Sequence, residues 1–274
     1  INGLRVDAGV YPERLRAAID AGWHTGKELP GSAGLGHVGA MKLISDGSLN
    51  TRSAYCSTPY SGIEPLTYGT LSYTPQQIED YMRLATEHGF DIACHAIGDE
   101  ANTIALNAVA ATHAHGSIEH AQILKPVDIP RFAELGLTAS IQPQHAMDDR
   151  DVITRFWANP AGIPYPFRAL HDAGTTLRMG SDAPVAPLDP WLAISAAVLG
   201  TESSDREPFQ PEQCLDVHTS LAASTATGRD RLASGDPADV VLLDADPYAA
   251  DTPEAMRAMP QHVVMTLLCG ERTY

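Results

Sequence analysis

The stretch FDIACHAIGDEANTIALNAVAATHAHGSIEH, residues 90–120, decides the fold class. It opens with a short apolar run, continues with a helical pattern over residues 100–113, and returns to a second apolar run at residue 116. Two apolar runs joined by a helix are typical of the β-α-β unit of a parallel sheet. Each run ends in a histidine, His95 or His120, and this placement raises the question of what the two imidazoles do.

The same alternation of strand and helix extends in both directions. Strands are predicted within residues 4–10, 39–47, 90–97, 116–124, 137–145 and 175–182. Helices are predicted within residues 12–26, 76–89, 100–113, 128–136, 166–174 and 187–200, with a loop after His145 and one further helix over 212–227. The tail differs, because residues 238–247 and 262–274 resemble antiparallel strands with no strong helix between them.

Six β/α units are compatible with a (β/α)8 barrel and also with a doubly wound sheet. The position of the polar residues discriminates between them, because a barrel carries its functional groups at the carboxyl ends of several strands. Candidates stand at five consecutive strand ends: Lys42, His95, His120, Gln142 with His145, and Asp182. A switch-point crevice draws mostly on two loops, so the pattern favours an α/β fold of the partial TIM-barrel type.

Composition narrows the function classes. The chain has 274 residues and a net charge of −16, which argues against binding to nucleic acid or to an anionic membrane. Its four cysteines form no CxxC pair, and the chain has neither an 18-residue apolar run nor a signal-peptide pattern. We therefore expect a cytoplasmic protein with reduced thiols, although a processed or truncated start at Ile1 is compatible with these features.

The strand-end residues suggest metal chemistry. Two histidines and an aspartate at one mouth would supply zinc-type ligands, with room left for water. An ammonium late in an apolar strand is costly, so Lys42 would tend to be neutral and could react with CO2 to give a bridging carbamate. Asp182 could bind metal and accept a proton from a water molecule.

Each candidate also has a structural interpretation. A strand-end histidine is often a hydrogen-bonded structural group, and Lys42 could form a salt bridge, for example with Asp46. Asp182 could cap the turn that follows it. His145 could be a surface loop residue instead of a substrate contact, and the tyrosines of loop 48–73 could either line a substrate site or simply pack.

The motifs MKLISDGSLNTRSAYCSTPY, CHAIGDEA, IEHAQ, QPQHAMDD, GSDAPVAPLDP and SGDPADVVLLDADP together resemble amidohydrolase family 3. This is the YtcJ-like branch of the amidohydrolase superfamily, the group that contains N-substituted formamide deformylase. The resemblance runs in order from about residue 38 to the C-terminus. It implies a metal-dependent hydrolase on a (β/α)8 barrel, with residues 1–232 in the barrel and residues 233–274 in the C-terminal part of a small β-sandwich.

The resemblance also implies roles for individual residues. His95 and His120 match ligands of a second metal, Lys42 matches a lysine that can be carboxylated, and Asp182 matches an aspartate that binds the first metal and moves the proton. The expected cofactor is a divalent metal, zinc before others, with one or two ions bound. His145 and Gln142 are the expected substrate contacts.

The sequence departs from the family at its first strand. The superfamily carries an H-x-H pair there, which is lacking here, and HAH at residues 113–115 lies between a helix and a strand, on the wrong side of a barrel. About two β/α units are also missing, so we expect strands 3 to 8 of a longer enzyme. A chain of this kind should be poorly stable alone or depend on a partner, either a second copy or a missing N-terminal segment.

The leading functional hypothesis is hydrolysis of an amide-like C–N bond in a small molecule by a metal-activated water. A second hypothesis, from another class, is a non-catalytic or truncated fragment that keeps the fold for packing or association. An isomerase or deaminase on the same scaffold is a third. Metal content separates the first two, because an active enzyme should hold divalent metal that substitution of His95 or His120 releases.

Overall fold

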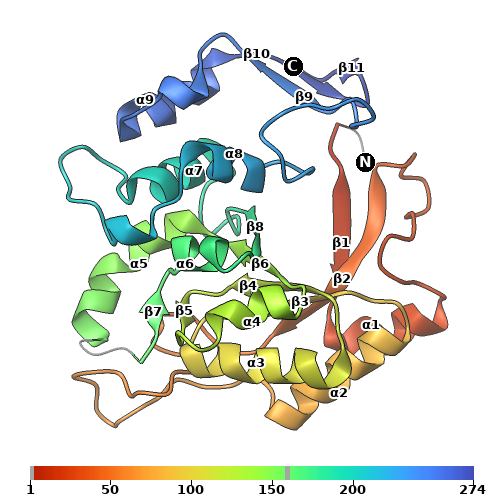
Figure 1. The fold of residues 1–274 in the computed structure, drawn as a ribbon. Helices are drawn as coiled ribbons and strands as arrows, with labels where there is room; N and C mark the ends of the chain where they lie inside the picture. Colours follow the sequence, from red (N-terminus) through yellow and green to blue (C-terminus); the bar gives the residue numbers. More distant parts are fainter. Residues whose placement is uncertain (1–2, 158–160) are drawn as a thin grey trace. The chain divides into compact units, whose positions relative to one another are not determined.

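Figure 1 shows the fold in the computed structural model, which describes residues 3–157 and 161–274. The chain divides into two compact units. Unit 1 contains the described residues of 1–140 and 151–176, and unit 2 contains residues 141–150 and 177–274. The first four strands and the helices that follow them all belong to unit 1.

The main sheet has six strands whose order follows the chain. They are β1 (Val6–Val10), β2 (Gly36–Ile44), β3 (Ile92–Ala96), β4 (Gly116–His120), β6 (Thr138–Ile141) and β8 (Thr176–Met179). β1 pairs with β2, β2 with β3, β3 with β4 and β4 with β6, all in parallel. A doubly wound sheet reverses its strand order at a switch point, and this sheet has no reversal. The predicted α/β fold of the barrel type is confirmed, as a partial barrel.

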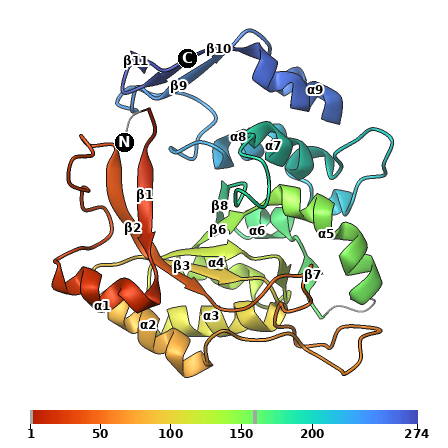
Figure 2. The same ribbon diagram turned by 180° about the vertical axis from the view of Figure 1, so that it is seen from behind.

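Helices follow the strands of unit 1 as predicted. They are α1 (Pro12–Asp20), α2 (Pro75–Glu87), α3 (Asp99–Thr112), α4 (Ile129–Glu134) and α6 (Phe167–Asp172). Figures 1 and 2 show α2 and α3 side by side along one face of the sheet. A two-stranded antiparallel pair, β5 (Ile123–Leu124) with β7 (Ile163–Pro164), was not predicted, because two-residue strands carry no periodic signal.

Burial alternates along β3 and shows which face of the sheet His95 is on. Ile92, Cys94 and Ala96 are fully buried, whereas Ala93 and His95 are half-buried. Because successive side chains of a strand point to opposite faces, His95 lies on the less covered face of the sheet. Cys94 therefore packs on the opposite, covered face.

The start of α2 is fixed by local chemistry. The Thr74 hydroxyl accepts a hydrogen bond from the Gln77 backbone N–H, and the Gln77 side chain accepts one from the Thr74 backbone N–H. This reciprocal pair is a capping box, with Pro75 at the first helical position. Ile78, Met82 and Ala85 then form the buried face of the helix.

Thr74→Ala is expected to lower the free energy of unfolding by about 1 kcal/mol, because one N–H donor of α2 loses its partner. Urea unfolding followed by circular dichroism measures the change. Ser72→Ala is the control, since Ser72 is exposed and contributes its backbone N–H to Ser45. The control should change stability by less than about 0.5 kcal/mol. Equal losses in the two variants would contradict the role of the cap.

Unit 2 combines helices with a small antiparallel sheet. β9 (Val240–Leu243), β10 (Val263–Leu268) and β11 (Glu271–Arg272) form this sheet in the order β11-β10-β9. Helices α7 (Pro190–Leu199), α8 (Val217–Ala223) and α9 (Pro253–Ala258) belong to the same unit. Its core cluster is formed by Trp191, Ile194, Met256 and Met259. The predicted antiparallel tail strands are confirmed.

Three details of the prediction were wrong. The loop expected after His145 is helix α5 (Pro143–Phe156). The helix expected over 212–227 is shorter, because a 3-10 turn at Pro211–Gln213 precedes α8. A helix, α9, separates the two tail strands, and its buried Met256 joins it to the core of unit 2.

The four cysteines are free thiols, and two of them should be inert. Burial raises the pKa of the Cys56 and Cys94 thiols to about 12. At pH 8 roughly 10⁻⁴ of each would be the reactive thiolate. Brief treatment with iodoacetamide should therefore modify exposed Cys269 and leave Cys56 and Cys94 intact, as measured by peptide mapping. Modification of Cys94 as fast as Cys269 in the folded protein would contradict this.

Among the described residues, no helix is both long and apolar enough to cross a membrane. The division into a barrel portion, residues 1–232, and a sandwich portion, residues 233–274, stays a prediction.

Candidate metal-binding and catalytic site

Lys42 and His95 lie on the same face of the sheet in unit 1. The β2–β3 register pairs Lys42 with Ala93 and Ile44 with His95, so Lys42 and His95 are two register positions apart on neighbouring strands. Cross-strand partners share a face. Lys42 is half-buried. The structure therefore places both predicted residues at the carboxyl ends of β2 and β3.

The imidazoles of His95 and His120 are in contact. Their ring centroids are 4.4 Å apart with an interplanar angle of 68°. His95 is the last residue but one of β3 and His120 is the last residue of β4, and the register sets His95 opposite Glu119 and His120 opposite Ala96. Two imidazoles from adjacent strand ends are thus brought together, as the sequence predicted.

The backbone of His120 is in the left-handed conformation. Its φ is 74°, and that of Ala121 is 46°, so two non-glycine residues in succession are left-handed. This conformation costs roughly 1–2 kcal/mol for an ordinary L-residue. His120 is 5% exposed, and its side chain is held at the strand end where the chain turns. Strain of this kind is concentrated at functional sites.

The alternative pairing of Lys42 with Asp46 is not what the structure has. The Asp46 carboxylate accepts hydrogen bonds from the backbone N–H groups of Tyr55, Ile97 and Gly98. Its Oδ1 also lies 3.4 Å from His95 Nε2. Asp46 is therefore part of the surroundings of His95, a role that the sequence did not indicate.

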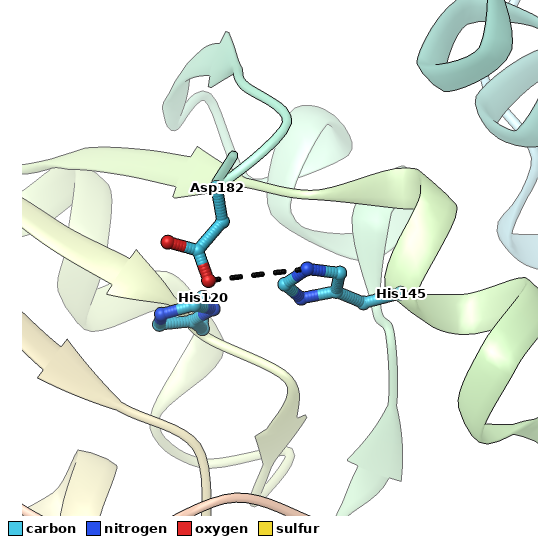
Figure 3. A group of neighbouring side chains, drawn as sticks. All are labelled: His120, His145 and Asp182. Carbon is cyan, nitrogen blue, oxygen red and sulfur yellow. Dashed lines mark ion pairs between the residues drawn. The ribbon is translucent and has the colours of Figure 1, made fainter. Parts of the chain in front are cut away.

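In unit 2, His145 and Asp182 form a pair. His145 Nε2 lies 3.9 Å from Asp182 Oδ2, the contact that is dashed in Figure 3. His145 stands in the first turns of α5 and is 7% exposed, so the surface-loop interpretation was wrong. Gln142, at the end of β6, is 5% exposed. Neither placement tests the predicted substrate contacts.

Asp182 lies in the turn after β8. Its φ is 56°, and its backbone carbonyl accepts the N–H of Val185 at 2.9 Å. The Asp182 carboxylate is 44% exposed and faces His145, as Figure 3 shows. The turn is thus closed by the backbone carbonyl, and the carboxylate remains accessible for chemistry.

The HAH stretch, residues 113–115, does not lie at the carboxyl ends of the strands. His113 is the left-handed C-cap of α3. The carbonyl of His115, one residue before β4, accepts the N–H of Ile92 at the start of β3. Both histidines are therefore at the amino ends of the strands, opposite to His95 and His120, which is the side of the barrel that the sequence predicted for them.

The loop tyrosines do not all face solvent. Tyr60 is 1% exposed, its ring lies 4.4 Å from that of Trp157, and its hydroxyl donates to the carbonyl of Ala54. Burial raises the pKa of Tyr60 far above its usual range. Tyr60 therefore packs, whereas Tyr68 is exposed.

Each unit contains side chains that suit a divalent metal. Unit 1 offers the imidazole nitrogens of His95 and His120, and unit 2 offers the imidazole of His145 and the carboxylate of Asp182, all of them ligand types that zinc prefers. The imidazole of His95 is in contact with that of His120. Imidazole and carboxylate groups form metal sites with nitrogen and oxygen ligands.

The fold and these strand-end groups define a class of protein, the α/β proteins built on a partial or complete parallel barrel with functional groups at the carboxyl ends of the strands. Residues 6–274 match the amidohydrolase family. The chain belongs to this family, as the motifs predicted.

Individual relatives agree with this assignment. The chain is 31% identical over 264 residues to YtcJ of Bacillus subtilis, whose name places it among the amidohydrolases; the match covers 89% of this chain and 49% of YtcJ. It is 25% identical to N-substituted formamide deformylase of Arthrobacter pascens, over 79% of this chain and 42% of that enzyme. The chain spans about half the length of the curated relatives it matches.

Solved structures show the same relationship. A metal-dependent hydrolase from Pyrococcus horikoshii, itself uncharacterized, matches with a TM-score of 0.72 and 29% identity. The match covers 82% of this chain and 45% of that one. A second such hydrolase, from Pyrococcus furiosus, matches with a TM-score of 0.68 and 28% identity over the same shares.

Proposed function

We propose that this chain is a metal-dependent hydrolase that cleaves an amide-like C–N bond in a small molecule. The observation that carries the proposal is the contact between the His95 and His120 imidazoles at the ends of adjacent parallel strands. A shared metal ion would use a nitrogen donor of each imidazole. The names of the relatives support hydrolysis.

Zinc is the proposed metal, with one or two ions. His95 and His120 would be ligands, and the family resemblance adds Lys42, in carboxylated form, and Asp182. When bound, such an ion supplies Lewis acidity toward a carbonyl and lowers the pKa of water toward about 7. Carboxylation would join CO2 to the amine of Lys42 with loss of a proton, and Lys42 lies half-buried late in β2.

The protein's own residues handle orientation and protons. Asp182 is proposed to accept a proton at its carboxylate and to pass it to the leaving nitrogen. The Nε2 atom of His145 lies 3.9 Å from Asp182 Oδ2. The His145 imidazole would therefore orient that carboxylate, and it would also contact the substrate. Gln142 offers an amide donor and acceptor to the same small molecule.

A hydrolysis assay tests the proposal. The zinc-loaded 274-residue chain is offered a panel of N-formyl, N-acyl and cyclic amide compounds, and the released amine or acid is measured. Wild type should hydrolyse at least one member, and Asp182→Asn should lose about 10²–10⁴ of that rate. Asp244→Asn is the matched control, because Asp244 also pairs with a histidine, His262, at 2.8 Å in unit 2.

The control variant should retain the wild-type rate. A zinc-loaded wild-type chain that hydrolyses no compound of the panel would overturn the proposal and favour the non-catalytic alternative. Equal loss in Asp182→Asn and Asp244→Asn would also count against it, since general disturbance of unit 2 would then explain the effect.

A further inference from the structure

Asp46 is a completely buried carboxylate directly after β2. Its side chain is 0% exposed. Oδ1 accepts the N–H of Ile97 at 3.0 Å, and Oδ2 accepts the N–H groups of Tyr55 and Gly98 at 2.9 Å each. A buried carboxylate is costly unless donors surround it, and here three backbone N–H groups do so. The carboxyl group is therefore fixed in place by the backbone of two separate segments.

Asp46 also lies beside His95. Oδ1 lies 3.4 Å from His95 Nε2, and the carbonyl oxygen of Gly47 lies 3.5 Å from the same nitrogen. Carboxylate and carbonyl oxygens accept hydrogen bonds and cannot donate them. Both neighbours therefore favour the tautomer in which Nε2 carries the hydrogen and Nδ1 keeps its lone pair.

We propose that Asp46 is a positioning residue that fixes the tautomer and orientation of the His95 ring, so that Nδ1 is the atom presented to a metal ion. Carboxylates that accept a hydrogen bond from the second nitrogen of a metal-binding imidazole orient the ring and raise its basicity. This inference rests on the proposed function for the identity of the ligand atom. The tautomer itself is a property of the metal-free chain.

Asp46 also joins the loop after β2 to the turn after β3. The backbone N–H of Tyr55 donates to Asp46, and the backbone carbonyl of Tyr55 accepts the N–H of Ala101 at 3.1 Å. Asp99 makes a parallel attachment, because its carboxylate accepts the N–H and the hydroxyl of Ser57. Asp99 is buried like Asp46 and holds the same loop. It is therefore a matched control for the structural part of the role of Asp46.

Nitrogen-15 NMR of the histidine rings in the metal-free protein tests the proposal. The His95 signals are assigned by their absence in His95→Ala. Wild type should show His95 with its hydrogen on Nε2. Asp46→Asn should shift the ring toward a mixture of tautomers, because an amide group at this position offers a donor as well as an acceptor. Asp99→Asn should leave the His95 tautomer unchanged.

Zinc affinity gives a second readout. Asp46→Asn should weaken zinc binding about 10–100-fold, and Asp99→Asn should weaken it by less than about threefold. A wild-type His95 with its hydrogen on Nδ1 would overturn the proposal even if Asp46→Asn fails to fold. Equal changes in the two aspartate variants would overturn it as well. If wild type binds no zinc but His95 has the expected tautomer, the proposed function fails and the positioning by Asp46 stands.

Discussion

His120→Asn is expected to remove stoichiometric divalent metal from the protein. The substitution deletes an imidazole that contacts His95 at a ring-centroid distance of 4.4 Å. Loss of a direct ligand should lower the zinc affinity by more than roughly 100-fold, the upper range for loss of a group that hydrogen-bonds to a ligand. Asparagine is preferred to alanine as the substitution, because asparagine tolerates the left-handed backbone of residue 120 and its amide oxygen is a poor zinc ligand.

The measurement is metal analysis of purified protein after zinc loading and dialysis. Wild type should retain near-stoichiometric zinc, and both His120→Asn and His95→Ala should retain almost none. His113→Ala is the control, because His113 caps α3 at the opposite end of the strands. Zinc retained by His120→Asn at the wild-type level would contradict the assignment of His120. Zinc lost from His113→Ala alone would move the site to the amino ends of the strands.

Gly98→Ala is expected to destabilise unit 1 by about 3 kcal/mol, the upper range of overpacking costs. A Cβ at residue 98 would lie 2.0 Å from the carbonyl oxygen of Tyr55, 2.4 Å from its carbonyl carbon and 2.7 Å from its nitrogen. These are backbone atoms of the loop that Asp46 holds, so no side chain can rotate away. Either the loop or the start of α3 has to move.

Thermal unfolding measures this effect. For a chain of this size, about 3 kcal/mol corresponds to a fall in Tm of roughly 6–12 °C. Gly180→Ala is the control, because a Cβ there meets nothing within 4 Å. The control should change stability by less than about 0.5 kcal/mol. A Gly98→Ala protein as stable as wild type would contradict the close approach of the loop to α3.

Much of the fold could be predicted because its signals are local. Alternating apolar runs and helical spacing gave the parallel strands and their helices, and the capping box at Thr74 is visible in four residues. The placement of His95 at a strand end followed from the same pattern. The loop expected after His145 was wrong because proline and many polar residues suggest a loop, whereas Pro143 simply opens α5.

The parts that could not be predicted depend on distant contacts or backbone strain. The partners of Asp46 lie up to 52 residues away and are backbone N–H groups, which no residue type reveals. A salt bridge with nearby Lys42 was the simpler expectation. Likewise, the left-handed φ values of His120 and Asp182 are set by tertiary structure, since few non-glycine residues adopt a positive φ and no glycine marks either position in the sequence.

X-ray absorption spectroscopy at the zinc edge tests the central claim most directly. The zinc-loaded wild-type chain should give a first shell of nitrogen and oxygen alone at about 2.0–2.1 Å, with the outer-shell scattering of at least two imidazoles. The outer-shell scattering of these two imidazoles should disappear in the double variant with His95→Ala and His120→Asn. A first shell containing sulfur at about 2.3 Å, or a shell without imidazole scattering, would contradict the claim that His95 and His120 bind the metal.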